Sequence, residues 1–317
     1  MMSSSTIRLI SGTSNRELSR GIADFMQIPL SELDVVRFAN DNLKIRINES
    51  VRGDDVFFIQ TSRPPVNDIL FETLQAIDAL KHASAGRITA VLPYYPYVRS
   101  DKKDEPRVSI SARLVADLLQ TAGADRILTM NLHSPQIQGF FSIPADHILA
   151  EKLVTDYFLK KDLSNAVVIS PDAGSAKLAA AYARILKLPL AIMDKRRFDD
   201  NDDARVYHVI GEVKGKDALI FDDEISTAGS MIEAEQALRK MGVNSIRAFA
   251  VHGVLAGPAI ERLKNSSMDE VVITNTISIS ESRKWDKLTV LDVSPIFAEA
   301  ISHIHTGESL STIFSDK

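Results

Sequence analysis

The sequence predicts an α/β protein with two domains, each a mainly parallel sheet flanked by helices. Short runs of apolar and β-branched residues alternate with segments whose apolar residues recur at helical spacing. Alternation of this kind gives parallel sheets, with ligand sites at the carboxyl ends of the strands. A chain of 317 residues is also long enough for two domains, because domains commonly have about 150 residues.

The expected strands are short apolar runs, several of which end in polar or Gly/Pro-containing loops. They are Val56–Gln60, Ile88–Leu92, Ile127–Leu132, Val167–Ser170, Ala218–Phe221, Ile246–Val251 and Glu270–Thr274. The expected helices lie between them and show apolar residues on one face. They are Asn67–Ala83, Ile110–Ala122, Ser175–Leu186 and Ser230–Met241.

An internal repeat supports two domains of the same kind. The segment Ser111–His133 aligns with Ser230–His252, so that Gly123 falls on Gly242. Upstream, the segments 56–62 and 167–173 are related in a similar way. Two copies of one α/β domain are the simplest explanation, and we expect domains at residues 1–148 and 149–317.

Composition narrows the functional class. A net charge of −5 argues against general nucleic-acid binding, so any phosphate specificity must come from local sites. No window approaches the roughly 18 apolar residues of a membrane span, and the first residues do not form a secretory signal. The absence of cysteine excludes disulfides and thiol nucleophiles and fits a cytoplasmic protein.

The most informative segment runs from Ala218 to Ser230. An apolar strand is followed by Asp222 and Asp223, then by a loop of small residues, and then by a helix. Unpaired N–H groups at a helix N-terminus attract phosphate, and the adjacent carboxylates can accept hydrogen bonds from a sugar diol. This order predicts a ribose-phosphate site formed by Asp222, Asp223, Ser226, Thr227, Ala228, Gly229 and Ser230. The alternative is a helix cap, since Ser230 and Glu233 have the spacing of a capping box.

Two further strand ends carry residues suited to a metal ion. Asp172 lies in the segment Ser170–Lys177, and His133 ends another predicted strand. Mg²⁺ needs few protein ligands when substrate phosphates and water complete its shell. We therefore predict Mg²⁺ at His133 and Asp172, one from each domain, although a capping Asp and a structural His are serious alternatives.

Two charged segments are expected to be loops. Arg99–Arg107 follows the aromatic run Tyr94–Tyr97, a combination suited to a nucleotide polyphosphate. In the second, Asp194–Asp203, Lys195 and Arg197 could neutralise charge that develops on a transferring group. Solvated surface loops are the default interpretation of both.

Taken together, these segments resemble the ribose-phosphate pyrophosphokinases (phosphoribosyl pyrophosphate synthetases) over essentially the whole chain. Further marks of that family are spread along the sequence. They are Glu49–Gly53, Pro65–Asp68, Ile77–Leu80, Arg87–Val91, Gln136–Phe141, Ser170–Gly174, His252–Ile260, Thr274–Ile277 and Ala298–Ile301.

The resemblance implies two tandem phosphoribosyltransferase-like domains, the first on the ATP side and the second on the ribose 5-phosphate side. It implies an Mg²⁺-dependent transfer of the diphosphoryl group of ATP to the C1 hydroxyl of ribose 5-phosphate, leaving AMP. Lys195 and Arg197 would be catalytic, and Arg197 would also meet ribose 5-phosphate. The ATP contacts would be Phe38, Asn40, Asp41, Asn42, Arg99 and Ser100, with the adenine segment lent by a neighbouring subunit.

The resemblance also implies a homohexamer regulated by phosphate and ADP, without nucleic-acid or membrane partners. The effector site would use Ser50, Arg52, Ser84, Arg107, Ser309 and Ser311. Four residues depart from the family pattern, namely Ser226, Asn131, Ser100 and Asn42. The alternatives are a non-catalytic regulatory subunit of such an enzyme and a phosphoribosyltransferase.

Overall fold

The structure, a computed structural model, describes residues 5–196 and 206–313. Within them the chain forms two compact units. The first contains the chain up to Ala150, Thr276–Ser278 and the segment from Asp292 onward; the second contains Glu151–Asn275 and Ile279–Leu291. Each unit has a seven-stranded, mainly parallel sheet flanked by helices, which confirms the predicted fold class.

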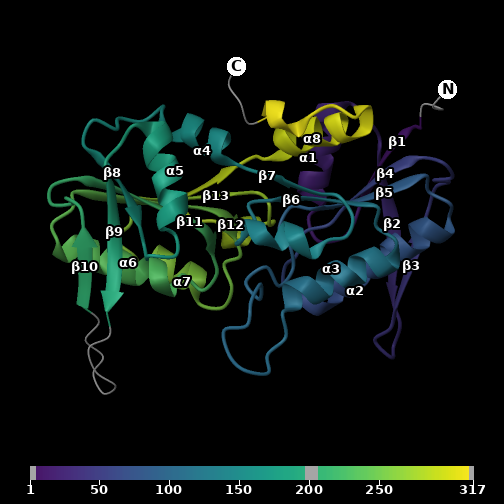
Figure 1. Cartoon of the computed structure of the whole chain (residues 1–317), viewed down its shortest axis with the longest axis horizontal. Helices are drawn as coiled ribbons and strands as arrows, with labels where there is room; N and C mark the ends of the chain where they lie inside the picture. The colour runs from purple at the N-terminus through teal and green to yellow at the C-terminus, as the bar shows by residue number, and fades with distance from the viewer. Residues whose placement is uncertain (1–4, 197–205, 314–317) are drawn as a thin grey trace. The chain divides into compact units, whose positions relative to one another are not determined.

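The first sheet consists of β1 (Ile7–Ser11), β2 (Leu30–Arg37), β3 (Leu43–Ile47), β4 (Asp55–Ile59), β5 (Arg87–Leu92), β6 (Arg126–Met130) and β7 (Ala145–Ile148). Its helices are α1 (Arg16–Met26), α2 (Val66–His82), α3 (Ser111–Ala122) and α8 (Ser294–Thr306), with short 3₁₀ helices η1 (Pro135–Phe140) and η3 (Leu310–Ile313). The strand order is β3-β2-β1-β4-β5-β6-β7, and β2 and β3 form an antiparallel hairpin. Helices α1 and α8 cover one face of the sheet and α2 and α3 the other (Figure 1).

The second sheet repeats this plan with β8 (Ala166–Ser170), β9 (Leu190–Arg196), β10 (Val206–Ile210), β11 (Asp217–Ile225), β12 (Ser245–Gly253), β13 (Glu270–Thr274) and β14 (Leu288–Leu291). Its helices are α4 (Glu151–Phe158), α5 (Ala176–Leu186), α6 (Gly229–Lys240) and α7 (Ala259–Lys264), with the 3₁₀ turn η2 (Glu281–Arg283). The order is β10-β9-β8-β11-β12-β13-β14, with β9 and β10 antiparallel. Helices α4 and α5 lie on one face and α6 and α7 on the other (Figure 1).

The predicted strands and helices are all present, with ends within two residues of those expected except in β11. That strand continues past Phe221 to Ile225 because β12 runs alongside it, pairing Asp222 with Ala250 and Ile225 with Gly253. Asp222 and Asp223 therefore lie within the carboxyl-terminal part of the strand rather than after it.

The two sheets have the same strand order, so the internal repeat is present in the fold. The sequence alignment, however, pairs each strand–helix unit with the neighbour of its structural counterpart. The alignment places α3–β6 on α6–β12. In the sheets, β12 has the place of β5, and the counterpart of β6 is β13. Consecutive strand–helix units share the same alternation of apolar runs, so a unit aligns readily with the neighbour of its true counterpart.

The C-terminal helix α8 packs on α1 and belongs to the first unit. A Cβ at Gly21 of α1 would lie 2.4 Å from Oγ of Ser294, so the two helices approach closely. Nδ1 of His305 lies 2.7 Å from Oδ2 of the buried Asp55, and Nε of Arg87 donates to Oδ1 of the same residue at 2.7 Å. The predicted domains, 1–148 and 149–317, divide the chain at one point. The compact units are not continuous in sequence, because Thr276–Ser278 and the segment from Asp292 onward belong to the first unit.

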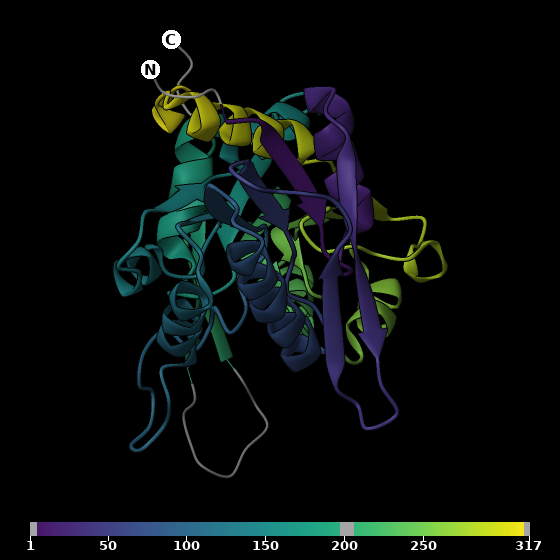
Figure 2. The ribbon, with the colours of Figure 1, turned by 90° about the vertical axis from the view of Figure 1, so that its right-hand side faces the viewer.

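The hairpin of β2 and β3 extends beyond the other strands of the first sheet as an arm (Figure 2). Only the first part of β2 pairs with β1, from Leu30 to Glu32, and the rest pairs with β3 alone. Among the described residues, no helix is both long enough and apolar enough to cross a membrane.

Candidate active site

The strand order of the second unit reverses between β8 and β11, where a ligand site is expected. The chain leaves β8 toward β9 on one side, whereas β11 is followed by β12 on the other, so the order reverses there. Ligands in open α/β sheets bind outside the carboxyl ends of the strands at such a reversal. Asp172 follows β8, and Asp222 and Asp223 lie near the end of β11, which pairs directly with β8.

Aromatic side chains pack against β11, the strand that carries these carboxylates. The ring of Phe221 stacks on that of Tyr182 in α5, with centroids 4.3 Å apart and planes 18° apart. Phe158 and Phe249 meet the ring of Phe221 at centroid distances of 5.3 and 5.8 Å. Close-packed aromatic side chains of this kind fix the position of the backbone that follows them.

Asp222 has an unusual electrostatic environment. Burial and the negative charge of Asp223 raise the pKa of Asp222 well above its usual range. Oδ1 of Asp222 accepts hydrogen bonds from the backbone N–H of Asp223 at 3.0 Å and from Oγ of Ser175 at 3.1 Å. A shifted carboxyl group at the carboxyl end of a parallel strand is typical of a functional site.

The loop after β11 is suited to an anion. Ala228, at the N-cap of α6, has a left-handed backbone (φ 60°) and makes no side-chain cap hydrogen bond. The capping-box alternative is therefore not what the structure shows: Ser230 is the second residue of α6. The N–H groups at this helix start lack a capping side chain, the arrangement that binds phosphate.

The same loop is anchored by its neighbours. The backbone N–H groups of Leu255 and Ala256 donate to the carbonyl oxygens of Ile225 and Ser226, at 3.0 and 2.9 Å. Nη1 of Arg262 in α7 donates to the carbonyl oxygen of Thr227 at 3.0 Å. A preorganised loop of this kind can hold an anion with little ordering cost.

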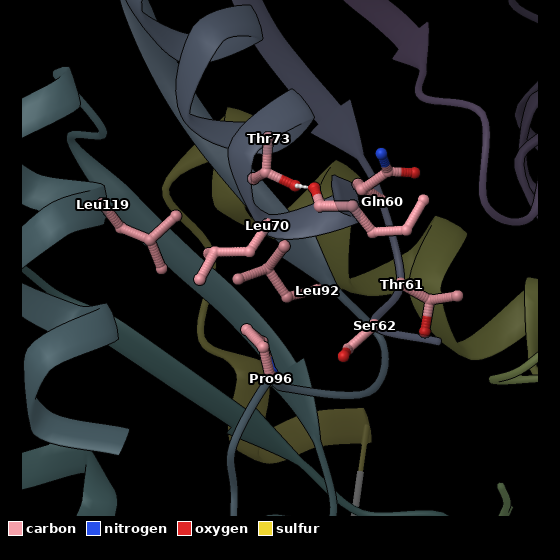
Figure 3. Close-up of a pocket in the computed structure, with 9 residues that line it drawn as sticks. Gln60, Thr61, Ser62, Leu70, Thr73, Leu92, Pro96 and Leu119 are labelled. Carbon is pink, nitrogen blue, oxygen red and sulfur yellow. Dashed lines mark hydrogen bonds between the residues drawn. The ribbon is translucent and has the colours of Figure 1, made fainter. Parts of the chain in front are cut away.

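The corresponding place in the first unit is filled by its own side chains. Oε1 of the buried Glu72 accepts from Nε2 of Gln60 at 2.7 Å and from the N–H of Thr13 at 2.9 Å, and Oε1 of Gln60 accepts from the N–H of Ser14. A pocket lined by Gln60, Leu70 and Leu92 lies beside this network and has a volume of about 10 Å³ (Figure 3). That is room for about one water molecule, so the ribose-phosphate site that we predict fits the second unit and not this part of the first.

The predicted adenine segment is the tip of the hairpin of β2 and β3. Phe38 is half exposed, and its N–H and carbonyl oxygen bond to Asn42 and Asp41, both at 2.9 Å, to form a tight turn. Arg37 fixes this tip, because its guanidinium donates to Asp41 and to Asp68 at the start of α2, each at 2.6 Å. Oδ1 of Asn40 accepts from the N–H of Asn42.

Arg99 and Ser100 lie in a loop, as predicted for the charged segment before α3. The side chain of Arg99 is exposed. Oγ of Ser100 donates to the carbonyl oxygen of Ser109 and accepts from the N–H of Ser111, both at 3.2 Å. The Ser100 hydroxyl therefore supports the start of α3.

His133 follows β6, two strands away from β4, so it does not lie where the strand order of the first unit reverses. Its side chain is exposed. The neighbouring backbone is fixed, because the N–H of Leu132 donates to Nε2 of His147 at 2.9 Å. Asn131 has a positive φ of 40°, and its Oδ1 accepts from the N–H of Ala150 at 2.8 Å. Asn131 thus supports the end of β6.

The burial of His147 predicts a pH-dependent stability. Burial lowers the pKa of His147 to about 4 from the ordinary 6.5. The unfolded chain then binds more protons between these values, so the free energy of unfolding falls as the pH drops from about 6.5 to about 4. Since one pKa unit corresponds to about 1.4 kcal/mol, wild type should lose roughly 3 kcal/mol more than His147→Gln across this range.

Urea unfolding at several pH values measures this difference. The glutamine keeps an acceptor for the N–H of Leu132 but does not titrate. Parallel pH profiles for the two proteins would contradict the assignment of a neutral, buried His147.

Lys195 lies in β9, with its backbone opposite Tyr207 of β10. The segment expected as a loop from Asp194 therefore begins within β9, since the edge strand β10 pairs with β9 as far as Arg196. Arg197 and the rest of that segment, up to Asp203, lie outside the described residues.

The six predicted effector residues all belong to the first unit. The structure brings some of them together: Arg52 forms a β-bridge with Ala85, and the N–H of Gly53 donates to the carbonyl oxygen of Ser84 at 2.9 Å. Ser309 and Ser311 lie with their hydroxyl oxygens 2.8 Å apart, and Arg107 lies in the loop before α3. The side chains of Ser50, Arg52, Ser84, Arg107, Ser309 and Ser311 are all exposed.

Asp172, one of the two residues expected to hold Mg²⁺, keeps capacity for a cation. Within the described ranges, no group of three or more His, Asp or Glu side chains is placed to hold a metal ion. Asp172 is exposed, and its Oδ1 accepts one hydrogen bond, from the N–H of Ser175 at 2.9 Å. A carboxylate keeps capacity for a cation after one such bond, and Mg²⁺ takes the rest of its ligands from phosphates and water.

Two residues of the site were not predicted from the sequence, Ser175 and Arg262. Ser175 was expected as the start of a helix, and its bond to Asp222 depends on the adjacency of β8 and β11. Arg262 lies beyond the next strand, and no local pattern marks it. The sequence offers one signal for the role of Ser175: this serine directly follows Gly174 in the loop that carries Asp172.

Comparison with known proteins decides the family. A profile described as the N-terminal domain of ribose phosphate pyrophosphokinase matches residues 7–123, and one described as a phosphoribosyl synthetase-associated domain matches residues 205–315. The ribose-phosphate pyrophosphokinase of Deinococcus radiodurans is 49% identical over 316 residues, covering 98% of each chain. The chain belongs to the ribose-phosphate pyrophosphokinase family.

Other members of the ribose-phosphate pyrophosphokinase family agree with this placement. The protein of that name from Bacillus caldolyticus is 47% identical over 308 residues, covering 97% of this chain and 98% of its own. The crystal structure of phosphoribosylpyrophosphate synthetase from Mycobacterium smegmatis superposes with a TM-score of 0.91 at 42% identity, covering 95% of this chain and 99% of that one. The family and the enzyme class predicted from the sequence are confirmed.

Proposed function

We propose that the chain transfers the diphosphoryl group of ATP to the C1 hydroxyl of ribose 5-phosphate, giving 5-phosphoribosyl 1-pyrophosphate and AMP. The observation that carries this proposal is the strand reversal between β8 and β11, where paired carboxylates adjoin an uncapped helix start. Membership of the ribose-phosphate pyrophosphokinase family supports it. A non-catalytic subunit or a phosphoribosyltransferase fits the family less well.

The second unit would bind the sugar phosphate. The N–H groups and hydroxyls of residues 226–230 would hold the 5-phosphate, and the positive end of α6 adds to the attraction. Asp222 and Asp223 would accept hydrogen bonds from the ribose hydroxyls. Because this loop and strand are already held in place, binding fixes the C1 hydroxyl for an in-line reaction.

In the reaction, the C1 oxygen forms a bond to the β-phosphorus of ATP, and the bond from that phosphorus to the α,β-bridging oxygen breaks. The C1 hydroxyl gives its proton to solvent water, and AMP leaves with the bridging oxygen. Lys195 and Arg197 would neutralise the charge that develops on the transferring group, which is the main contribution a protein makes to such transfers. Arg197 would also contact ribose 5-phosphate.

Asp172 and His133 would hold Mg²⁺ together with the ATP phosphates. Bound there, the ion supplies neutralisation of phosphate charge. The carboxylate of Asp172 is the ligand type that Mg²⁺ prefers. The imidazole of His133 suits a phosphate oxygen or a metal-bound water as well as the metal itself.

ATP would be held by Arg99 and Ser100 and by the hairpin tip of Phe38, Asn40, Asp41 and Asn42. We propose that a neighbouring copy lends this tip, and, from the family resemblance, that the active form is a homohexamer. The extension of β2 and β3 beyond the other strands of the first sheet and the half-exposed ring of Phe38 support a role in contacts outside the unit. We also propose a cytoplasmic location, in keeping with a chain that has no cysteine.

One assay tests the proposed reaction. The purified protein is incubated with ATP, Mg²⁺ and ribose 5-phosphate, and AMP and the phosphoribosyl product are measured. AMP should form only when all three are present. If no AMP forms, or if it forms without ribose 5-phosphate, the proposed reaction is wrong.

Phosphate should activate the enzyme through the effector residues around Arg52. Exposed hydroxyls and two arginines drawn from distant parts of the first unit can bind a phosphate or the phosphates of ADP. Arg52→Ala should require several-fold more phosphate for half-maximal activity, whereas Arg20→Ala, an exposed arginine on α1, should match wild type. The measurement is initial rate across a phosphate titration, with and without ADP. Full activity of wild type without phosphate, together with purely ATP-competitive inhibition by ADP, would rule out this site.

A further inference from the structure

Ser175 occupies a helix start but does not cap the helix. It is the N-cap residue of α5, where serine commonly accepts a hydrogen bond from an N–H of the first turn. Here its backbone is in the right-handed helical region (φ −81°, ψ −2°), and its side chain makes no cap hydrogen bond. Instead, its Oγ donates to Oδ1 of Asp222 at 3.1 Å. The Ser175 hydroxyl therefore bonds to Asp222 of β11 and does not cap α5.

The backbone of the same residue holds Asp172. The N–H of Ser175 donates to Oδ1 of Asp172 at 2.9 Å, and Oγ of Ser170 donates to the carbonyl oxygen of Asp172 at 2.6 Å. The turn between them is tight, since a Cβ at Gly174 would lie 3.2 Å from Oδ1 of Asp172. Asp172 is thereby fixed relative to Ser175.

These contacts make Ser175 the link between two carboxylates with different proposed roles. Its N–H binds the carboxylate expected to meet the metal ion, and its hydroxyl binds the carboxylate expected to meet the ribose. With the N–H of Asp223, two donors converge on Oδ1 of Asp222 and fix the orientation of that carboxyl group. Because Asp222 is partly buried, the loss of one donor is costly there.

We infer that Ser175 is a positioning residue that aligns Asp222 for the ribose hydroxyls and joins it to Asp172. This inference rests on the proposed function, because it assumes that Asp222 binds the sugar. The hydroxyl acts through Asp222 and not by touching the reacting atoms. Its removal therefore affects the sugar substrate first.

A matched control exists at the start of β11, the strand that carries Asp222 near its other end. Oγ of Ser245, at the start of β12, donates to Oδ1 of Asp217, at the start of β11, at 2.6 Å. Ser245→Ala removes a serine–aspartate hydrogen bond of the same kind, far along β11 from Asp222. It reports the structural cost of such a bond without the positioning effect.

Calorimetric titration of ribose 5-phosphate, without ATP or Mg²⁺, tests the inference. We expect Ser175→Ala to weaken binding about 3- to 10-fold, the range for one lost hydrogen bond. Ser175→Thr, which keeps a hydroxyl, should bind within about 2-fold of wild type, and Ser245→Ala should bind like wild type. In steady-state assays Ser175→Ala should raise the KM for ribose 5-phosphate and leave the KM for ATP unchanged. Thermal melting shows that each variant is folded.

The outcomes separate the two levels of the proposal. If wild type binds ribose 5-phosphate and Ser175→Ala binds it equally well, the positioning role is overturned while the proposed function stands. Equal weakening in Ser175→Ala and Ser245→Ala would show a general structural effect and would also overturn it. If wild type neither binds ribose 5-phosphate nor forms AMP, the proposed function fails and the inference fails with it.

Discussion

Lys195→Ala is expected to lower turnover by about 10²- to 10³-fold, the effect of removing one preorganised charge contact to a transition state. Lys195 lies in β9, at the edge hairpin of the second sheet, next to the segment that contains Arg197. Lysine side chains are rarely part of a protein core. The free energy of unfolding should therefore change by less than about 0.5 kcal/mol.

Initial rates at saturating ATP and ribose 5-phosphate measure the loss, and thermal melting measures stability. Lys264→Ala is the control, because Lys264 is an exposed lysine of the same unit, on α7. It should retain wild-type turnover. Turnover of Lys195→Ala close to that of wild type would remove Lys195 from the mechanism.

The buried strands and the helices beside them could be predicted because their signals are local. An apolar run such as Ala218–Phe221 is buried on both faces in the structure, and α2 and α3 show the expected apolar stripe. Helix α1 carried a usable signal that was missed: Asn15 caps it by accepting from the N–H of Leu18 at 3.2 Å.

The hairpin of β2 and β3 and helix α8 were harder to predict. Strand β2 does not alternate regularly, whereas β3 alternates apolar and charged residues from Leu43 to Ile47 and so carried a local signal that was missed. Helix α8 follows β14 of the second unit in the chain, but it belongs to the first unit and packs on α1. The C-terminal segment returns to the first unit through contacts such as that of His305 with Asp55, which join residues 250 positions apart.

In the candidate site, too, local features could be predicted and contacts between distant segments could not. Asp222 and the loop after it could be predicted from one continuous segment, because strand, carboxylates and helix start follow one another in the chain. The roles of Ser175 and Arg262 could not, since each depends on which strands and helices lie side by side. The shifted repeat has the same origin: local patterns identify strand–helix units but do not number them within a sheet.

Replacing Asp222 and Asp223 together by asparagine is expected to raise the KM for ribose 5-phosphate about 10²-fold and to change the KM for ATP far less. Hydrogen bonds to a charged group contribute about 1.5–3 kcal/mol each, and the amides carry no charge and present a donor to the ribose hydroxyls.

The pH dependence should change in the same variant. Burial and the charge of Asp223 raise the pKa of Asp222, and the ionised form is the one that accepts both hydroxyls. The wild-type KM for ribose 5-phosphate should therefore fall as the pH rises through that raised pKa, whereas the KM of the double variant should depend much less on pH.

Calorimetry of ribose 5-phosphate binding and steady-state kinetics at several pH values measure both effects. Asp217→Asn is the matched control, because Asp217 begins the same strand and is bonded by Ser245 at the opposite end. It should bind the sugar phosphate normally even if it is less stable. If Asp222 and Asp223 contact the sugar, the loss of both charged acceptors from the site must weaken binding. Normal binding by the double variant would therefore show that the two carboxylates do not contact the sugar and have a structural role.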